Sequence, residues 1–184
     1  MDILVDAYIE LRRRKEFEDV GLAITGGSTG DDTAYLKEIR RELKRNNLFD
    51  SVDFHEVFEG EGRQDFFSKV SVISVPVRNG EAFGIYLLEA MASGIPVVQP
   101  SVGAFPEIVK LAGGGILYSP DSHVILAEAL AGLLSDPKLL DKLSLEGRKG
   151  IEEHFDISKH TNETISIYSA IIRKKKEVID VITG

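Results

Sequence analysis

The segment VSVISVPVRNGEAFGIYLLEAMASGIP, residues 70–96, combines a hydrophobic run, a turn and a helix that begins at a glycine. In Val70–Val77, valine and isoleucine are separated only by serines and one proline, which is typical of a parallel strand covered on both faces. Asn79-Gly80 then predicts a turn. The segment therefore predicts a buried strand whose carboxyl end leads directly into a helix.

The predicted helix covers Ile85–Ala92, with Gly84 at its start and Gly94 and Pro96 just beyond its end. The first turn of a helix has backbone N–H groups without intrahelical acceptors, and it lies at the positive end of the helix dipole. A strand end that faces such a helix start forms a binding site for anions. The segment therefore predicts a phosphate site.

Two carboxylates lie in or beside this helix. Glu81 precedes it, and Glu89 follows eight residues later between Leu88 and Ala90. A carboxylate with apolar neighbours is costly to bury unless hydrogen-bond donors reach it. Two interpretations are open: nearby backbone N–H groups satisfy Glu89 while Glu81 only favours the helix dipole, or both carboxylates bind a ligand.

The motif EAFGIYLLE, followed by AMASGIPVV, resembles the E-x7-E motif of the retaining glycosyltransferases of family 4, which use nucleotide sugars and have the GT-B fold. VGAFPEIV at 102–109 resembles the family's next motif, although Ala104 stands where a second glycine is usual. VGLAITGG at 20–27 and VDFHEVF at 52–58 resemble its second and third strands, and GGGILYSPDS at 113–122 resembles its last strand. The resemblance covers nearly the whole chain.

The expected fold is α/β: a Rossmann-like parallel sheet with helices on both faces plus C-terminal helices, forming one half of a GT-B fold. Strands and helices alternate along most of the chain, which predicts parallel strands joined by right-handed crossovers. Residues 1–184 are expected to form a single nucleotide-sugar-binding domain. The expected strands cover residues 20–25, 52–58, 70–77, 95–99 and 115–118, and the expected C-terminal helices cover 124–134, 137–155 and 157–178.

The resemblance implies a role for each site residue. Glu81, the first glutamate of the motif, is expected to be catalytic and to contact the transferred sugar, and Glu89 is expected to accept hydrogen bonds from the ribose hydroxyls. The remaining donor-binding positions lie at the helix start and at strand ends, where an α/β sheet binds ligands. Backbone groups at the helix start are expected to meet the diphosphate and sugar, and the third strand is expected to meet the base: Phe83, Gly84, Ile85, Gly26, Val57 and Phe58.

The function implied is donor binding in a glycosyltransferase of the hexosyltransferase type, which moves a sugar from a nucleoside diphosphate sugar to an acceptor with retention. No cofactor and no metal ion are expected, in line with family 4. Asp31 and Asp32 are adjacent, without the spacing of a metal-binding D-x-D motif, and are expected to cap the next helix. The alternatives are a non-catalytic nucleotide-sugar binding or interaction module, and a GT-B epimerase or phosphorylase.

One departure from the family pattern concerns its first strand and the following loop, which carries an Arg and a Lys for the diphosphate. This chain begins at the helix after that loop, so the strand, the loop and the N-terminal acceptor domain are expected to be absent, and the chain alone is expected to be inactive. A gap is expected between the second and fourth strands of the sheet. The sheet could close up, take a strand from Val178–Ile182, or take one from a second copy in a homodimer.

The amino-acid composition excludes several classes of binding partner and site. The net charge of −8 argues against a nucleic-acid surface, which is normally basic, and the lack of cysteine excludes disulfides and thiolate metal sites. No apolar run reaches the ~18 residues of a membrane span and no signal peptide precedes the first helix, so a cytoplasmic domain is expected. Arg173–Lys176 has two interpretations: a solvated helix end, or attraction to a membrane surface in peripheral association.

Overall fold

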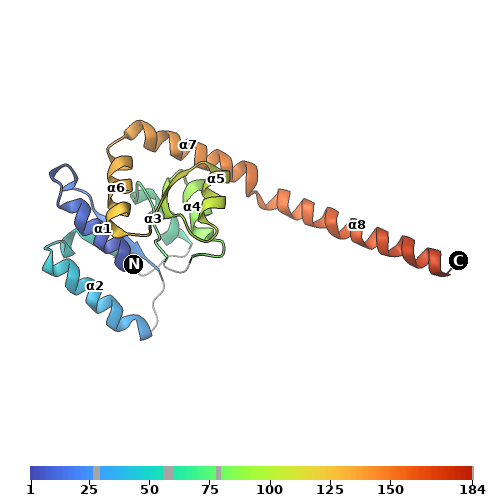
Figure 1. Cartoon of the computed structure of the whole chain (residues 1–184), viewed down its shortest axis with the longest axis horizontal. Coiled ribbons are helices and arrows are strands. Elements are labelled where there is room, and N and C mark those ends of the chain that lie inside the picture. The colour runs from blue at the N-terminus through green and yellow to red at the C-terminus, as the bar shows by residue number, and fades with distance from the viewer. Residues whose placement is uncertain (27–29, 56–59, 78–79, 184) are drawn as a thin grey trace.

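The computed structural model describes residues 1–26, 30–55, 60–77 and 80–183 (Figure 1). The first part of the chain alternates helices and strands, and the last part is helical. The elements are α1 (Asp2–Arg12), η1 (Lys15–Phe17), β1 (Leu22–Thr25), η2 (Gly30–Asp32), α2 (Thr33–Arg45), η3 (Phe49–Ser51), β2 (Val52–His55), α3 (Glu61–Lys69), α4 (Ile85–Ala92), β3 (Val97–Pro100), α5 (Phe105–Ala112), β4 (Gly115–Tyr118), α6 (His123–Leu134), α7 (Pro137–His154) and α8 (Ile157–Thr183).

The named strands form two separate parallel pairs. β1 pairs with β2, with Ile24 opposite Phe54, and β3 pairs with β4, with Val98 opposite Ile116. The segment 70–77 lies beside β3 but joins it through a single bridge at Ile73. There the Ile73 N–H donates to the Pro96 carbonyl (3.0 Å), and the Val98 N–H donates to the Ile73 carbonyl (2.9 Å).

The prediction of a regular, doubly buried strand over Val70–Val77 was therefore wrong in part. The segment is extended and parallel to β3 at Ile73, but within it only Pro76 is buried. A doubly buried strand lies inside a parallel sheet, with neighbouring strands on both sides and helices over both faces. This segment has β3 on one side and a cavity on the other.

The cavity has a volume of about 1080 Å³ and separates the two halves of the sheet. β1 and the segment 70–76 line its two sides, and Leu4, Tyr8 and Leu11 of α1 line it as well. The gap expected between the second and fourth strands is thus present, and the sheet has not closed up. The proposed repair by Val178–Ile182 was wrong for this structure, because these residues continue α8 as a helix.

Helices cover both faces of the β3–β4 half. Val97 packs in a core with Leu87 of α4 and Phe105 of α5, whereas Val98 packs in a second core with residues of α1 and α6 such as Ala7 and Leu126. Because successive side chains of a strand point to opposite faces, this alternation places one helical layer on each side. A third core, around Ile24, Ile39 and Leu43, joins α1 and α2 to β1. The expected α/β layering is confirmed.

The start of α2 differs from the expected capping. Asp31 and Asp32 lie in the short η2 turn, and Asp32 occupies the N-cap position without a cap hydrogen bond from its side chain. Its backbone is in the right-handed helical region (φ −81°, ψ −10°). An N-cap side chain normally reaches the helix N–H groups from an extended backbone, so this conformation explains the difference.

Two close contacts hold α7 against the body. A Cβ on Gly150 would lie 2.1 Å from the Ala112 carbonyl oxygen, and a Cβ on Gly147 would lie 2.8 Å from the Gly114 Cα. α7 can approach α5 and the start of β4 this closely only because these positions are glycines. The chain then continues as α8, which extends away from the body as a single long helix (Figure 1).

Candidate functional site

The amino end of α4 is organised around Gly84. Gly84 is the N-cap, with a left-handed backbone (φ 80°, ψ 62°), and no side chain caps the helix. A Cβ at this position would lie 3.3 Å from both Glu81 Cγ and Phe105 Cε1. Among the described residues, no side chain accepts a capping hydrogen bond from the first turn of α4, and glycine fits easily at its N-cap position.

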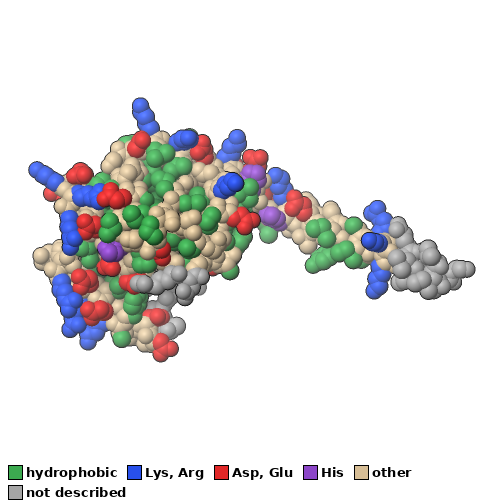
Figure 2. All heavy atoms as spheres, viewed as in Figure 1, with side chains coloured by type: hydrophobic (Ala, Val, Ile, Leu, Met, Phe, Trp, Pro, Cys, Tyr) green, Lys and Arg blue, Asp and Glu red, His purple; other side chains and the backbone are tan. Residues whose placement is uncertain are grey.

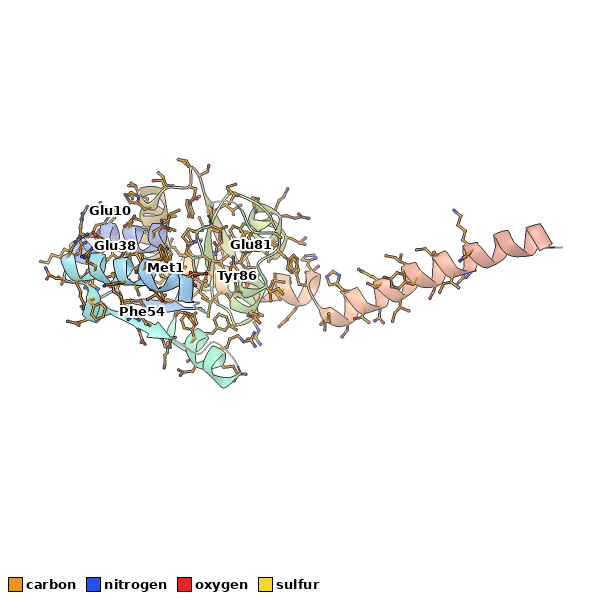
Figure 3. The ribbon with its side chains drawn as sticks, turned by 90° about the horizontal axis from the view of Figure 1, so that it is seen from below. Met1, Glu10, Glu38, Phe54, Glu81 and Tyr86 are labelled. Carbon is orange, nitrogen blue, oxygen red and sulfur yellow. The ribbon has the colours of Figure 1, made fainter. Side chains whose placement is uncertain are left out.

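Glu81 lies beside this helix start with both carboxylate oxygens in contact with donors (Figure 3). The Ala82 N–H donates to Oε1 (3.0 Å), and the Tyr86 hydroxyl donates to Oε2 (3.4 Å). Burial of the phenol, together with the negative charge and hydrogen bond of Glu81, raises the pKa of Tyr86 to about 12. The carboxylate is thereby oriented by its own loop and by the first turn of α4.

The segment before α5 fixes the backbone of Glu81. The Ala104 N–H donates to the Glu81 carbonyl (2.9 Å), and Gly103 lies directly over the same peptide. A Cβ on Gly103 would lie 2.5 Å from the Glu81 carbonyl oxygen and 2.6 Å from its nitrogen, and the Gly103 φ is +57°. Position 103 therefore requires glycine, whereas Ala104 is tolerated because it contributes a backbone donor.

Glu89 lies about one turn further along α4 and forms an ion pair with Arg63 of α3 through Oε1 and Nη1. Its side chain is 30% exposed. Of the two interpretations left open, the one in which backbone N–H groups satisfy the Glu89 side chain is therefore wrong, and Glu89 is not enclosed by apolar neighbours. Helix periodicity turns Leu87 and Ala90 into the core and Glu89 toward α3, so the sequence neighbours of Glu89 are not its spatial neighbours.

The other predicted residues fall into three groups. Phe83 and Ile85 flank Gly84 at the helix start and are both exposed, and Phe83 packs edge-on against Phe155 (6.4 Å between ring centroids). Gly26, at the end of β1, lines the cavity that Tyr86 also lines. Val57 and Phe58 lie outside the described residues.

Three of the residues that form this site were not identified from the sequence. Tyr86, Arg63 and His55 all contact or approach the predicted positions. His55 lines the cavity, with its Nε2 atom 2.9 Å from Asp53 Oδ2. Tyr86 follows Glu81 by five residues, and this short separation along the sequence could have indicated their contact. The separation between Arg63 and Glu89 gives no indication that the two side chains pair.

Within the ranges described, no group of three or more His, Asp or Glu side chains is arranged to hold a metal ion. A search of the same residues finds no helix with the length and apolar character needed to cross a membrane.

The family model of the group 1 glycosyl transferases matches residues 1–150 of this chain. The chain belongs to the group 1 glycosyltransferases. Among curated members, it is 30% identical over 176 residues to the lipopolysaccharide core biosynthesis mannosyltransferase LpsB of Rhizobium meliloti, covering 94% of this chain and 48% of LpsB. It is 27% identical to the phosphatidyl-myo-inositol mannosyltransferase of Mycobacterium leprae, covering 97% of this chain and 45% of that protein. The chain thus spans about half the length of the curated glycosyltransferases it matches.

Solved structures of glycosyltransferases share the fold. The C-terminal domain of the group 1 protein LpcC from Francisella tularensis matches with a TM-score of 0.73 and 26% identity, covering 84% of this chain and 78% of that one. Anabaena HepE in complex with UDP matches with a TM-score of 0.82 and 20% identity, covering 92% of this chain and 45% of HepE. The fold is that of the C-terminal domain of a GT-B glycosyltransferase, as expected from the motifs.

Proposed function

We propose that this chain binds the donor in a glycosyltransferase that moves a hexose from a nucleoside diphosphate sugar to an acceptor with retention. The observation that carries the proposal is the uncapped amino end of α4 at Gly84, with the carboxylate of Glu81 held beside it. Free N–H groups and the positive dipole end suit a diphosphate, whose negative charge grows as the glycosidic bond breaks. HepE, whose structure contains UDP, has the same fold.

The residue roles in this proposal follow the positions described above. The N–H groups around Phe83, Gly84 and Ile85 bind the diphosphate and sugar, Glu81 contacts the transferred sugar, and Glu89 accepts hydrogen bonds from the ribose. Oε2 of Glu89 has no partner among the described residues, so it has lone pairs left for a hydroxyl. The proposed transfer uses no metal ion.

We also propose that the cavity between β1 and the segment 70–76 takes one more parallel strand when the sheet is complete. The support is the pair of extended edges that line an apolar cavity, and the Ser74 hydroxyl, which is buried there without a hydrogen-bond partner among the described residues. The carboxyl end of such a strand would lie near Gly26 and Tyr86, next to the site. Transfer is therefore proposed for the complete protein, and this chain alone is expected to bind without catalysing transfer.

Thermal unfolding with UDP, GDP, ADP and their sugar conjugates tests donor binding. A nucleotide at a hundred times its Kd should stabilise this chain by about 2.7 kcal/mol. Glu89→Ala should reduce that gain. Glu152→Ala, which changes an exposed glutamate on α7, should leave it unchanged. If none of the nucleotides raises the melting temperature, the donor-binding proposal is wrong for this chain.

A further inference from the structure

The ion pair between Arg63 and Glu89 is the contact through which α3 reaches the proposed donor site. Arg63 lies near the start of α3 and Glu89 near the middle of α4, 26 residues later. The Arg63 side chain is 40% exposed and that of Glu89 is 30% exposed. The pair therefore lies at the surface, open to a ligand that approaches α4 from solvent.

Exposed ion pairs contribute little to the stability of a fold, because water screens the charges and the side chains lose conformational freedom. The packing of α3 does not depend on this pair, since Phe66 and Phe67 of α3 are buried in the core that contains Leu87. A stabilising role is thus small at most. Stability therefore does not explain why Arg63 and Glu89 pair: either the pair has a role in the site, or it is an ordinary surface contact.

The position of Glu89 along α4 suits a contact with the ribose of the donor. Glu89 is five residues after Gly84, which places it about 7.5 Å along the helix axis from the proposed diphosphate position. A carboxylate has about four lone-pair positions on its two oxygens, and Arg63 Nη1 uses one on Oε1. The guanidinium is always charged, so its single bond to Oε1 is charge-assisted and restrains the carboxylate more strongly than a bond from a neutral donor would.

We propose that Arg63 is a positioning residue for ribose recognition: it fixes the carboxylate of Glu89 so that the free oxygen, Oε2, accepts a ribose hydroxyl. This inference rests on the proposed donor-binding function, and it adds a residue of α3 to the site. Arg63 acts through Glu89 and does not itself read the base or the diphosphate. Its loss therefore affects only the part of the affinity that depends on the ribose hydroxyls.

The test compares each nucleotide with its 2′-deoxy and 3′-deoxy forms by titration calorimetry. In the unmodified chain, removing the hydroxyl that Glu89 accepts should weaken binding about tenfold, because hydrogen bonds to charged groups are the stronger ones. In Arg63→Met this ratio should fall to below about threefold, and Arg63→Lys should restore part of it. Glu89→Gln combined with Arg63→Met should give no further loss, because both act on one contact.

Arg41→Met is the matched control. Arg41 is also an exposed arginine paired with a glutamate, Glu38, but it lies on α2. It should leave the ratio and the absolute affinity unchanged. Circular dichroism and melting curves should show that all variants remain folded.

Three results would overturn the inference. An equal loss of affinity for ribo and deoxy nucleotides in Arg63→Met would show that Arg63 attracts the diphosphate by charge alone. No change in either would show an ordinary surface pair. If the unmodified chain binds no nucleotide, the proposed function is wrong and this inference is wrong with it. If the chain binds nucleotides but the ratio of ribo to deoxy affinity is the same in Arg63→Met, only the inference is overturned.

Discussion

The half-buried phenol of Tyr86 donates a hydrogen bond to Glu81, the proposed catalytic carboxylate. The position of this carboxylate therefore depends on whether the phenol is protonated. As long as the phenol keeps its proton, it donates to Glu81 Oε2 and holds the carboxylate in place. If the phenol lost its proton, two negative charges would face each other across 3.4 Å in a partly buried place. Burial of the phenol is the main cause that raises the pKa of Tyr86 to about 12, and the charge and hydrogen bond of Glu81 raise it further.

The raised pKa of Tyr86 predicts a loss of stability in alkaline solution. Between pH 10 and about 12 the unfolded chain releases the phenolic proton while the folded chain keeps it, so the free energy of unfolding should fall as pH rises through this window. Below pH 10 the contribution is fully present. Urea unfolding at a series of pH values should show a shallower decline in Tyr86→Phe, and an identical decline in both proteins would contradict the assignment. Tyr118, whose pKa is also raised, remains as a shared background.

At the scale of single residues, the sequence predicted positions that depend on local backbone geometry. Gly84 and Gly103 were identifiable because only glycine takes their positive φ without strain and allows close approach. Glu81 was identified through the same motif. Arg63 was not identifiable, because its contact with Glu89 depends on how α3 packs beside α4, and a single sequence carries no signal for such a pairing.

Among the elements, α4 was predicted at its observed bounds, Ile85–Ala92, because Gly84 and Gly94 mark both ends. The segment 70–77 was predicted less well. Its composition favours a strand, but strand structure depends on hydrogen-bonded neighbours that composition does not contain. The same limit explains why Val178–Ile182 was considered as a strand: a short run of valine and isoleucine also continues a helix that has already begun upstream.

The packing of α7 gives a prediction at the scale of elements. Gly150→Ala should lower the free energy of unfolding by at least about 2 kcal/mol, because the new Cβ would overlap the Ala112 carbonyl and α7 would have to move. Gly132→Ala in α6 is the matched control. It has open space around it, so alanine should stabilise the helix by about 0.5–1 kcal/mol. Urea unfolding of both variants measures the contrast, and a similar effect of the two substitutions would contradict the close-contact argument.

At the scale of the whole molecule, the sheet is divided and the last helix is separate from the body. The resemblance to family 4 predicted this division, as a gap between the second and fourth strands of the sheet. The sequence predicted the last helix over 157–178, and α8 continues to Thr183. The side chains of α8 up to Lys175 are exposed to solvent (Figure 2). The large hydrophobic ones among them are Ile157, Ile165, Ile167, Tyr168, Ile171 and Ile172.

This exposed helix also sets how the molecule scatters X-rays in solution. A compact chain of this length has a radius of gyration of about 16 Å. α8 contains 27 residues and is about 40 Å long, so its mass far from the centre should raise the measured radius well above that value. A chain ending at Asp156 should return to about 15 Å. A helix folded back onto the body would instead leave the full chain near 16 Å, so the scattering curve reports directly whether α8 extends from the body or packs against it.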